Sequence, residues 1–383
     1  MSIPLDYEIL RLIWWLFLGV LLIGFAVMDG FDLGTAMLLP FVARNDAERR
    51  VTINAIGPFW DGNQVWLLLG GGAIFAAWPP VYATSFSGFY IAMFLVLATL
   101  ILRPVGFEFR NKLAGTGWRT FWDYALFAGG LVPGVVFGVA FGNLLQGVPF
   151  RIDGDLRVLY EGSGLFELLN PFGLLCGLVS AAMLATHGAI YLTLKTDGVV
   201  RERARRFAVI GAAATTVLFA LAGVWVWLGI DGYAITSAIA ADGPSNPLLK
   251  TVARRPGQWL ANYGAHPWMM IAPALGIGGP LLALLLTRLG RAGLAFVASA
   301  LGMLGIIATA GVSMFPFLLP SDIAPGASLT VWDASSSRLT LFVMLVATLI
   351  FLPTILIYTA IVFRALRGVI TPSLVEKNSA NLY

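Results

Sequence analysis

Ten residues at the start of a long apolar run carry the side chains best suited to chemistry inside a membrane. Residues 57–66 read Gly-Pro-Phe-Trp-Asp-Gly-Asn-Gln-Val-Trp, and the apolar run 67–78 follows directly. An ionisable group inside a membrane helix costs about 2.5–3.5 kcal/mol on insertion scales, so it must be neutralised, paired or hydrated. Asp61 is therefore a candidate proton-relay carboxylate, and Asn63 and Gln64 are neighbours that can hold water.

A second interpretation of Asp61 stays open. Pro58 suits the first turn of a helix, and an aspartate near a helix N-terminus is favoured by the helix dipole. Trp60 and Trp66 are typical of the aromatic belt at a membrane surface. If the helix begins near residue 53, a rise of about 1.5 Å per residue places Asp61 about 12 Å along it.

Other charged residues lie near the ends of apolar runs. Asp29 and Asp32 follow the first run, where two glycines indicate that the helix ends. They form either an entrance that collects protons or an interfacial pair bound to the basic residues that follow. Arg103 closes a later run, with Glu108 beyond it, and either extends its charge to the membrane surface or pairs with one of these carboxylates.

Nine apolar runs can position these side chains across a membrane. The chain of 383 residues is 58% hydrophobic and 11% charged, whereas soluble domains are about 25% charged. About 20 apolar residues cross the hydrocarbon layer. We therefore predict an all-α integral membrane protein that forms a single domain over residues 1–383, with nine transmembrane helices at 9–29, 53–77, 82–103, 121–144, 165–194, 207–229, 262–287, 291–317 and 337–363.

The distribution of positive charge orients these spans. Of the 24 lysines and arginines, 17 fall in the odd-numbered loops and the C-terminal tail, six fall in the even-numbered loops, and Arg11 lies in the first span. Positive charge marks the cytoplasmic side. The N-terminus is then periplasmic and the C-terminus cytoplasmic, as an odd number of spans requires, and Asp61 lies on the cytoplasmic side.

Several classes of site are excluded by composition. The lone Cys176 excludes an internal disulfide, and two histidines, His187 and His266, are too few for a multi-haem or multi-histidine metal site in this chain alone. His187, within the fifth predicted span, is interpreted as a hydrogen-bonded helix contact rather than an axial haem ligand. There is no nucleotide-binding glycine motif and no basic stripe of the kind that binds nucleic acid.

A series of motifs extends from residue 5 to the C-terminus. They lie at residues 5–8 (LDYE), 24–34 (GFAVMDGFDLG), 60–66 (WDGNQVW), 75–79 (FAAWP), 86–90 (FSGFY), 103–107 (RPVGF), 142–150 (GNLLQGVPF), 170–174 (NPFGL), 314–317 (MFPF), 332–334 (WDA) and 382–383 (LY). Together they closely resemble subunit II of the cytochrome bd quinol oxidases.

The resemblance implies an architecture and a set of partners. The family's subunit II has nine spans, built as two four-helix bundles plus a peripheral helix, in the bacterial cytoplasmic (inner) membrane. It forms a heterodimer with a subunit I of similar fold, which holds haems b558, b595 and d, and often a very small third subunit joins. The complex oxidises ubiquinol or menaquinol, reduces O2 to water with protons from the cytoplasm, and generates proton-motive force without pumping. No cofactor is expected in this chain, although some members hold a structural quinone.

The resemblance also assigns roles to single residues. Asp61 matches the family's proton-channel aspartate. Asp29 and Glu108 match acidic positions nearby, and Asp32 and Arg103 match positions regarded as essential for assembly or activity. The predicted proton path comprises Asp29, Asp32, Asp61 and Glu108. Residues expected to support assembly or activity are Trp60, Arg103 and Tyr383.

Two other functions stay open at this stage. A proton-coupled secondary transporter would carry an inverted repeat and broken helices at the midplane, and the only hint of a repeat is the echo of Trp60-Asp61 in Trp332-Asp333. A purely structural scaffold subunit would need none of the carboxylates for proton transfer.

Overall fold

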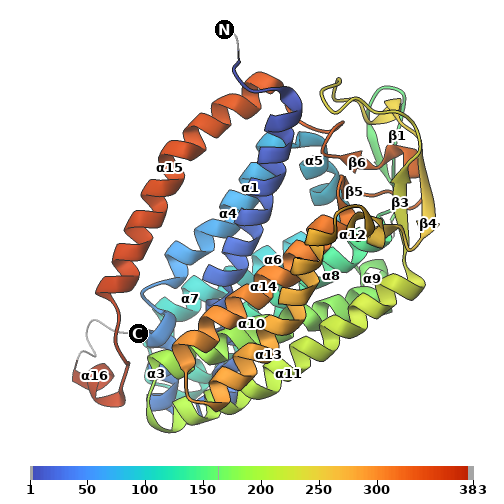
Figure 1. The fold of residues 1–383 in the computed structure, drawn as a ribbon. Coiled ribbons are helices and arrows are strands. Elements are labelled where there is room, and N and C mark those ends of the chain that lie inside the picture. Colours follow the sequence, from blue (N-terminus) through green and yellow to red (C-terminus); the bar gives the residue numbers. More distant parts are fainter. Residues whose placement is uncertain (1–2, 163, 378–383) are drawn as a thin grey trace.

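Long helices make up most of the molecule. The computed structural model describes residues 3–162 and 164–377 (Figure 1). Eight helical stretches in this part of the chain are long and apolar enough to cross a membrane. Two are composite, namely α1 (Tyr7–Met28) with α2 (Gly30–Val42), and α6 (Tyr90–Leu100) with α7 (Leu102–Phe109). The other six are α8 (Thr116–Gln146), α10 (Pro171–Lys195), α11 (Gly198–Gly229), α13 (Ile271–Arg288) with the short 3-10 helix before it, α14 (Ala292–Met314) and α15 (Arg338–Ala365).

Shorter elements connect the long helices. The remaining helices are α3 (Asp46–Ile56), α4 (Trp60–Ala77), α5 (Pro79–Gly88), α9 (Leu165–Leu168), α12 (Ala261–Ala265) and α16 (Pro372–Lys377). Three antiparallel two-stranded sheets pair β1 (Phe150–Ile152) with β2 (Val158–Tyr160), β3 (Asp231–Ile235) with β4 (Val252–Pro256), and β5 (Phe317–Leu319) with β6 (Leu329–Thr330). All three sheets lie outside the spanning helices, so the membrane part is all-α as predicted.

The first helix is longer than the predicted span 9–29. α1 and α2 form one stretch of 36 residues, Tyr7–Val42, or about 54 Å at 1.5 Å per residue. At Asp29 the helical bonding continues, because its amide donates to the Phe25 carbonyl at 2.9 Å and its carbonyl accepts from the Leu33 amide at 2.9 Å. The prediction that the helix ends here was wrong, and Asp29 lies inside the fold.

The second predicted span, 53–77, is interrupted. α3 ends at Ile56, residues 57–59 form a turn, and α4 begins at Trp60. Pro58 explains the interruption because it has no amide to donate and disfavours helical geometry in the residue before it. α4 also carries three polar side chains in its first five residues, and it is not one of the eight apolar stretches.

The other predictions correspond to helices with modest changes of boundary. Predicted span 82–103 consists of α5, α6 and α7, with breaks at Phe89 and Ile101. Predicted spans 121–144, 207–229, 291–317 and 337–363 correspond to α8, α11, α14 and α15, whereas 165–194 and 262–287 are each led by a short helix, α9 or α12.

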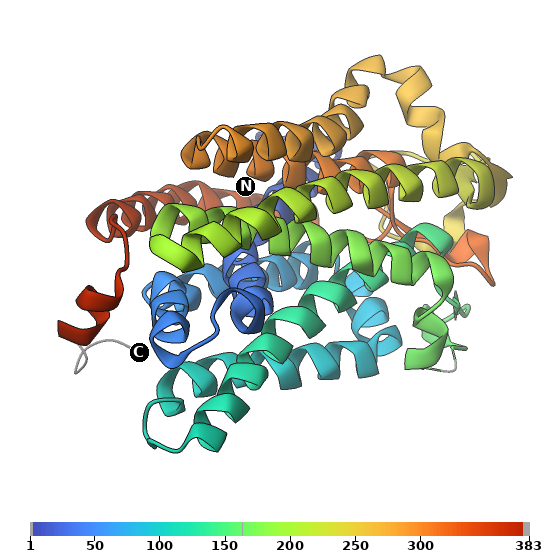
Figure 2. The same cartoon turned by 90° about the horizontal axis from the view of Figure 1, so that it is seen from below.

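The two ends of the helix assembly differ. The start of α1 and the sheets lie toward one end, while α3, α16 and the C-terminal end of α15 gather at the other (Figure 1). Seen from below, α10 and α11 lie between the α13–α14 pair on one side and α2 and α8 on the other (Figure 2). The helices α10, α11, α13 and α14 pack on one another, and α10 also packs on α2 and α8.

The crossing of α2 and α10 requires glycine. A Cβ added at Gly34 would overlap the backbone of Leu184, and one added at Gly188 would overlap the Thr35 amide. Small residues allow membrane helices to approach closely where no hydrophobic force drives them together. Gly34 therefore serves helix packing and does not end α2.

α15 is peripheral. Only 11% of its most apolar stretch of 18 residues is buried. One end contacts α1, where the Trp14 indole donates to the Leu341 carbonyl at 2.9 Å, and at the other end Phe363 stacks on Phe59 with ring centroids 4.4 Å apart. The helix is therefore attached mainly near its two ends.

Candidate functional site

A buried ion pair joins the junction of α1 and α2 to α7. The Arg103 guanidinium donates to both oxygens of Asp29, with Nη1–Oδ2 at 3.0 Å and Nη2–Oδ1 at 2.7 Å. The side chains are 1% and 0% exposed. Such a bidentate, charge-assisted pair is the strongest arrangement available to these groups. Of the alternatives left open by the sequence, pairing of Arg103 with a carboxylate is confirmed, and pairing of Asp29 with the basic loop that follows was wrong.

Asp32 lies one helical turn further along α2 and is also fully buried. Its Oδ2 accepts a hydrogen bond from the Asn63 amide at 2.8 Å. Its Oδ1, the Thr35 hydroxyl and the Arg103 Nε have no hydrogen-bond partner among the described residues. The site thus holds two carboxylates and one guanidinium, and the second carboxylate has no cation of its own.

The structure does not bring Asp61 into this cluster. Asp61 lies in the first turn of α4 and is exposed, whereas Asn63, two residues on, is 3% exposed and faces Asp32. Two residues turn an α-helix by about 200°, so the two side chains leave opposite faces. The interpretation of Asp61 as a residue of a helix N-terminus is confirmed. Its expected position about 12 Å along a continuous helix was wrong, because the chain turns at residues 57–59.

The outer face of α4 continues from Asp61 along the helix. Val65, Leu68 and Phe75 are 37%, 68% and 59% exposed, and a Cβ added at Gly72 would meet no atom within 4 Å. Asp61 therefore lies at one end of an apolar stripe that nothing in the described chain covers.

Of the remaining predicted site residues, Trp60 and Glu108 lie near the start of α4, and Tyr383 is not among the residues that the structure describes. The Trp60 ring stacks on Phe107 of α7, with centroids 5.2 Å apart and planes at 9°. Glu108, the next residue after Phe107, is exposed. Trp60 therefore anchors the start of α4 to the helix that carries Arg103 and Glu108.

A second charged cluster was missed by the sequence reasoning. Asp123 of α8 is buried and accepts from Arg110 at 2.6 Å and from Arg49 at 2.7 Å, and Asp46 bridges Arg110 and Arg119. Burial alone would lower the pKa of Arg110, but the hydrogen bond and charge of Asp123 raise it above its ordinary value. The signal that could have revealed this cluster was the aspartate just inside the predicted span 121–144.

The opposite end of the molecule has its own buried charges. Lys250 and Asp333 form an ion pair of 2.7 Å with side chains 1% and 4% exposed, and burial lowers the pKa of Lys250. Arg11, fully buried in α1, donates to Ser335 at 2.7 Å and to the Gly243 carbonyl at 2.9 Å. The contacts of Arg11 tie α1 to the segment between α11 and α12 and to the segment between α14 and α15.

His187 has no nitrogen available to an iron atom. Its Nδ1 lies 2.6 Å from the Ser299 hydroxyl, its Nε2 lies 3.1 Å from the Val27 carbonyl, and its ring stacks on Phe296. The interpretation of His187 as a helix contact is confirmed. Over residues 3–162 and 164–377 there is also no cluster of three or more histidine, cysteine, aspartate or glutamate side chains that could hold a metal ion.

Comparison with known proteins gives a consistent result over nearly the whole chain. The family described as cytochrome bd terminal oxidase subunit II matches residues 10–366. The chain is 55% identical over 379 residues to cytochrome bd-I ubiquinol oxidase subunit 2 of Escherichia coli, covering 99% of this chain and 100% of that protein. It is 52% identical over 379 residues to the probable cytochrome oxidase subunit 2 of Haemophilus influenzae, with the same coverage.

More distant relatives match as well. The cytochrome bd ubiquinol oxidase subunit 2 of Bacillus subtilis is 34% identical over 355 residues, covering 92% of this chain and 95% of that protein. A chain from the bd oxidase structure of Geobacillus thermodenitrificans superposes with a TM-score of 0.69 at 17% identity, covering 93% of this chain and 98% of that one. The last match supports the fold alone.

Proposed function

The chain belongs to the family of cytochrome bd terminal oxidase subunit II, and from this premise we propose that it is the non-haem subunit of a complex that oxidises quinol and reduces O2 to water. Its partner is a subunit I that holds haems b558, b595 and d, and those haems supply the electron transfer to O2. The residues of this chain hold and move protons and stabilise the assembly. The engagement of both His187 ring nitrogens supports a chain without a haem of its own.

The proposed membrane topology has nine spans, with α4 as the ninth. Two four-helix bundles and the peripheral α15 form the membrane part, the N-terminus is periplasmic and the C-terminus is cytoplasmic in the bacterial inner membrane. The excess of arginine and lysine in the odd-numbered loops supports this orientation. The gathering of the sheets at one end and of α3 and α16 at the other fits the same alternation (Figure 1).

One observation carries the proton-path proposal. Asp29 is neutralised by Arg103, whereas Asp32, equally buried, has only the Asn63 amide and one oxygen without a partner in the described chain. A buried carboxylate without its own cation favours its neutral form. We expect Asp32 to exchange a proton, and Asp29 to serve mainly to hold Arg103 in place.

Asp61 is proposed to act at the surface of this chain. It is exposed, and so is Glu108 on α7, whose neighbour Phe107 stacks on Trp60 beside Asp61. The apolar stripe that begins at Asp61 on α4 would be covered by subunit I in the complex. Asp61 then lies where protons pass between the subunits, with Glu108 near the entrance.

Substitution of Asp61 by asparagine tests the proposal. In the purified complex, Asp61→Asn should slow quinol-driven O2 uptake while leaving the b- and d-type haem bands of the reduced-minus-oxidised spectrum intact. The matched control is Asp155→Asn, which removes an exposed carboxylate from the turn between β1 and β2 and should leave uptake unchanged.

Each of the other outcomes contradicts a different part of the proposal. Normal O2 uptake in Asp61→Asn would make the chain a scaffold with no proton role at this position. Loss of the haem bands together with the activity would make Asp61 an assembly residue. Purification of the tagged chain without a second large subunit, colourless in mild detergent, would refute the oxidase assignment itself.

A further inference from the structure

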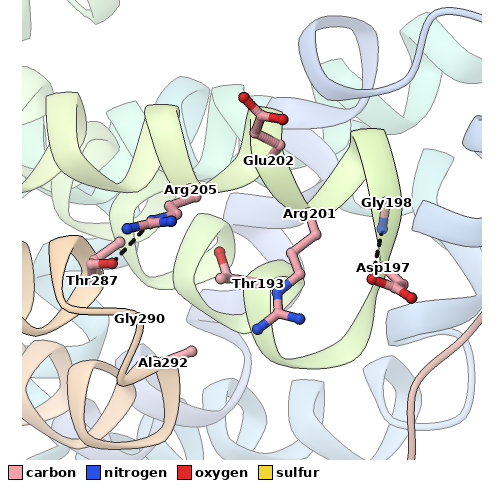
Figure 3. Close-up of a pocket in the computed structure, with 9 residues that line it drawn as sticks. All are labelled: Thr193, Asp197, Gly198, Arg201, Glu202, Arg205, Thr287, Gly290 and Ala292. Carbon is pink, nitrogen blue, oxygen red and sulfur yellow. Dashed lines mark hydrogen bonds between the residues drawn. The ribbon is translucent and has the colours of Figure 1, made fainter.

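A cavity of about 230 Å³ lies between two helix hairpins, at the end of the molecule opposite the sheets. One hairpin joins α10 to α11 and the other joins α13 to α14 (Figure 3). The lining residues are Thr193, Asp197, Gly198, Arg201, Glu202, Arg205, Thr287, Gly290 and Ala292. None of them belongs to the Asp29–Arg103 site, so the proposed oxidase function leaves the cavity without a role.

Two arginines from the same face of α11 line the cavity, and only one of them has hydrogen-bond partners in the described chain. Arg205 is anchored, because its Nε donates to the Thr287 carbonyl at 3.1 Å and its Nη2 to the Arg288 carbonyl at 2.6 Å, at the C-terminal end of α13. Arg201 lies one helical turn earlier and extends into the cavity (Figure 3). Across the ranges that the structure describes, the Arg201 guanidinium makes no hydrogen bond or ion pair.

The carboxylates at the cavity are already engaged. Asp197 caps α11 by accepting from the Gly198 amide at 2.8 Å. Glu202 pairs with Arg206 at 2.5 Å and points away from the cavity (Figure 3). The positive charge of Arg201 is therefore not cancelled by a direct partner, and the capped end of α11 is not itself the attraction for an anion.

We propose that this cavity binds the headgroup phosphate of one anionic phospholipid. The planar guanidinium suits a phosphate, to which it donates two parallel hydrogen bonds. Basic pockets between membrane helices on the cytoplasmic side are suited to such headgroups. The cavity lies at the ends of spanning helices, where headgroups lie, and Arg291 in the neighbouring turn adds positive charge to the approach. The inference rests on the chain being in a membrane and not on the oxidase role.

Lipid titration of the purified complex tests the inference. The delipidated complex is titrated in detergent with phosphatidylglycerol, and bound lipid is counted by native mass spectrometry. Arg201→Gln should weaken the tightest phosphatidylglycerol site about fivefold, from the contribution of one basic side chain near an anionic surface. Arg201→Lys keeps the positive charge but not the two parallel hydrogen bonds, so it should recover only part of this loss. The matched control is Lys112→Gln, which removes one charge from the turn between α7 and α8 and should leave the site unchanged.

Two parallel titrations identify the source of the phosphate. Phosphatidylcholine should not compete for the site, and sodium phosphate should compete only weakly. Tight binding of sodium phosphate that Arg201→Gln abolishes would overturn the lipid proposal in favour of a soluble anion. Equal phosphatidylglycerol binding by Arg201→Gln and Lys112→Gln would overturn the site altogether. Because no quinol or O2 is involved, these results are independent of the oxidase assay.

Discussion

Removal of Arg103 is the sharpest test of the buried ion pair. Arg103→Gln deletes both hydrogen bonds to Asp29 and leaves that carboxylate fully buried without a cation. Hydrogen bonds to charged groups contribute about 1.5–3 kcal/mol each, so the two bonds together give about 3–6 kcal/mol. Breaking a buried pair by removing one partner costs about 3–5 kcal/mol, and the two estimates agree.

This cost translates into a measurable change of melting temperature. An unfolding entropy of about 2.1 cal/mol/K per residue, applied to the 383 residues, converts 3–5 kcal/mol into a decrease of about 4–6 °C. The measurement is the tryptophan-fluorescence melting temperature of the detergent-solubilised complex. Asp29→Asn should be milder, because Arg103 then still interacts electrostatically with Asp32.

The double variant and an exposed pair supply the controls. Asp29→Asn combined with Arg103→Gln should destabilise by less than the sum of the single variants. Each single variant leaves one buried charge without its partner, whereas the double variant removes both charges of the pair. Glu202→Gln breaks a pair whose side chains are mostly exposed and should change the melting temperature little. Additive single effects, or a shift for Arg103→Gln no larger than for Glu202→Gln, would refute the argument that the pair is desolvated and coupled.

Three further predictions concern other parts of the fold. Gly34→Ala places a methyl group against the backbone of α10 and should destabilise the chain by about 1–3 kcal/mol or more. The control Gly19→Ala adds a methyl group in open space and should be neutral. Equal melting temperatures of the two variants would contradict the packing argument. Asp333→Asn leaves the buried Lys250 ammonium with the Pro247 carbonyl but without its carboxylate partner, and should cost about 3–5 kcal/mol. An unchanged melting temperature would show that the ammonium is hydrated. Burial alone would raise the pKa of Glu48, but the Arg44 amide and the Arg203 guanidinium that bind its carboxylate hold the pKa below its ordinary value of 4.5. The ionised carboxylate therefore stabilises α3 above about pH 4.5, and this stabilisation is lost as the pH falls further. Amide exchange in α3, corrected for intrinsic rates, should therefore be faster at pH 4 than at pH 6, and equal protection would count against the effect.

The sequence predicted most of the helices and the type of contact that Arg103 makes in the site. Long apolar runs predicted the spanning helices, because burial in lipid requires both length and low charge. They did not predict that the first helix continues to Val42 or that the second predicted span is interrupted between α3 and α4. Pairing of Arg103 with one of the carboxylates on the same membrane side was one of two interpretations, since opposite charges at the same membrane level attract, and only the structure identifies Asp29 as the partner.

The direction of Asp61 was not predictable in the same way. Whether a helix face points inward depends on which neighbour covers it, and for α4 the outer stripe is not covered within this chain. Pro58 did contain a local signal for the turn before α4, but an apolar run on both sides of it favoured a continuous helix. Asp123 was overlooked for a different reason, because its partners Arg49 of α3 and Arg110, just after α7, are distant in the sequence and their approach is a property of the tertiary fold.

The helix formed by α1 and α2 is synthesised first, but the partners of its buried charges are synthesised much later. Arg103 follows Asp29 by 74 residues, which at about 5–20 residues per second corresponds to about 4–15 s of synthesis. During that interval Asp29 and Asp32 have no Arg103 to pair with, and because an unpaired charge inside a membrane helix is costly, these acids would have to be neutral or hydrated if the helix enters the bilayer before the arginine is made. The other end of the helix waits longer, because Ser335, which accepts from Arg11, lies 324 residues downstream. A chain that terminates before the eighth loop would therefore leave the arginine of α1 without this partner.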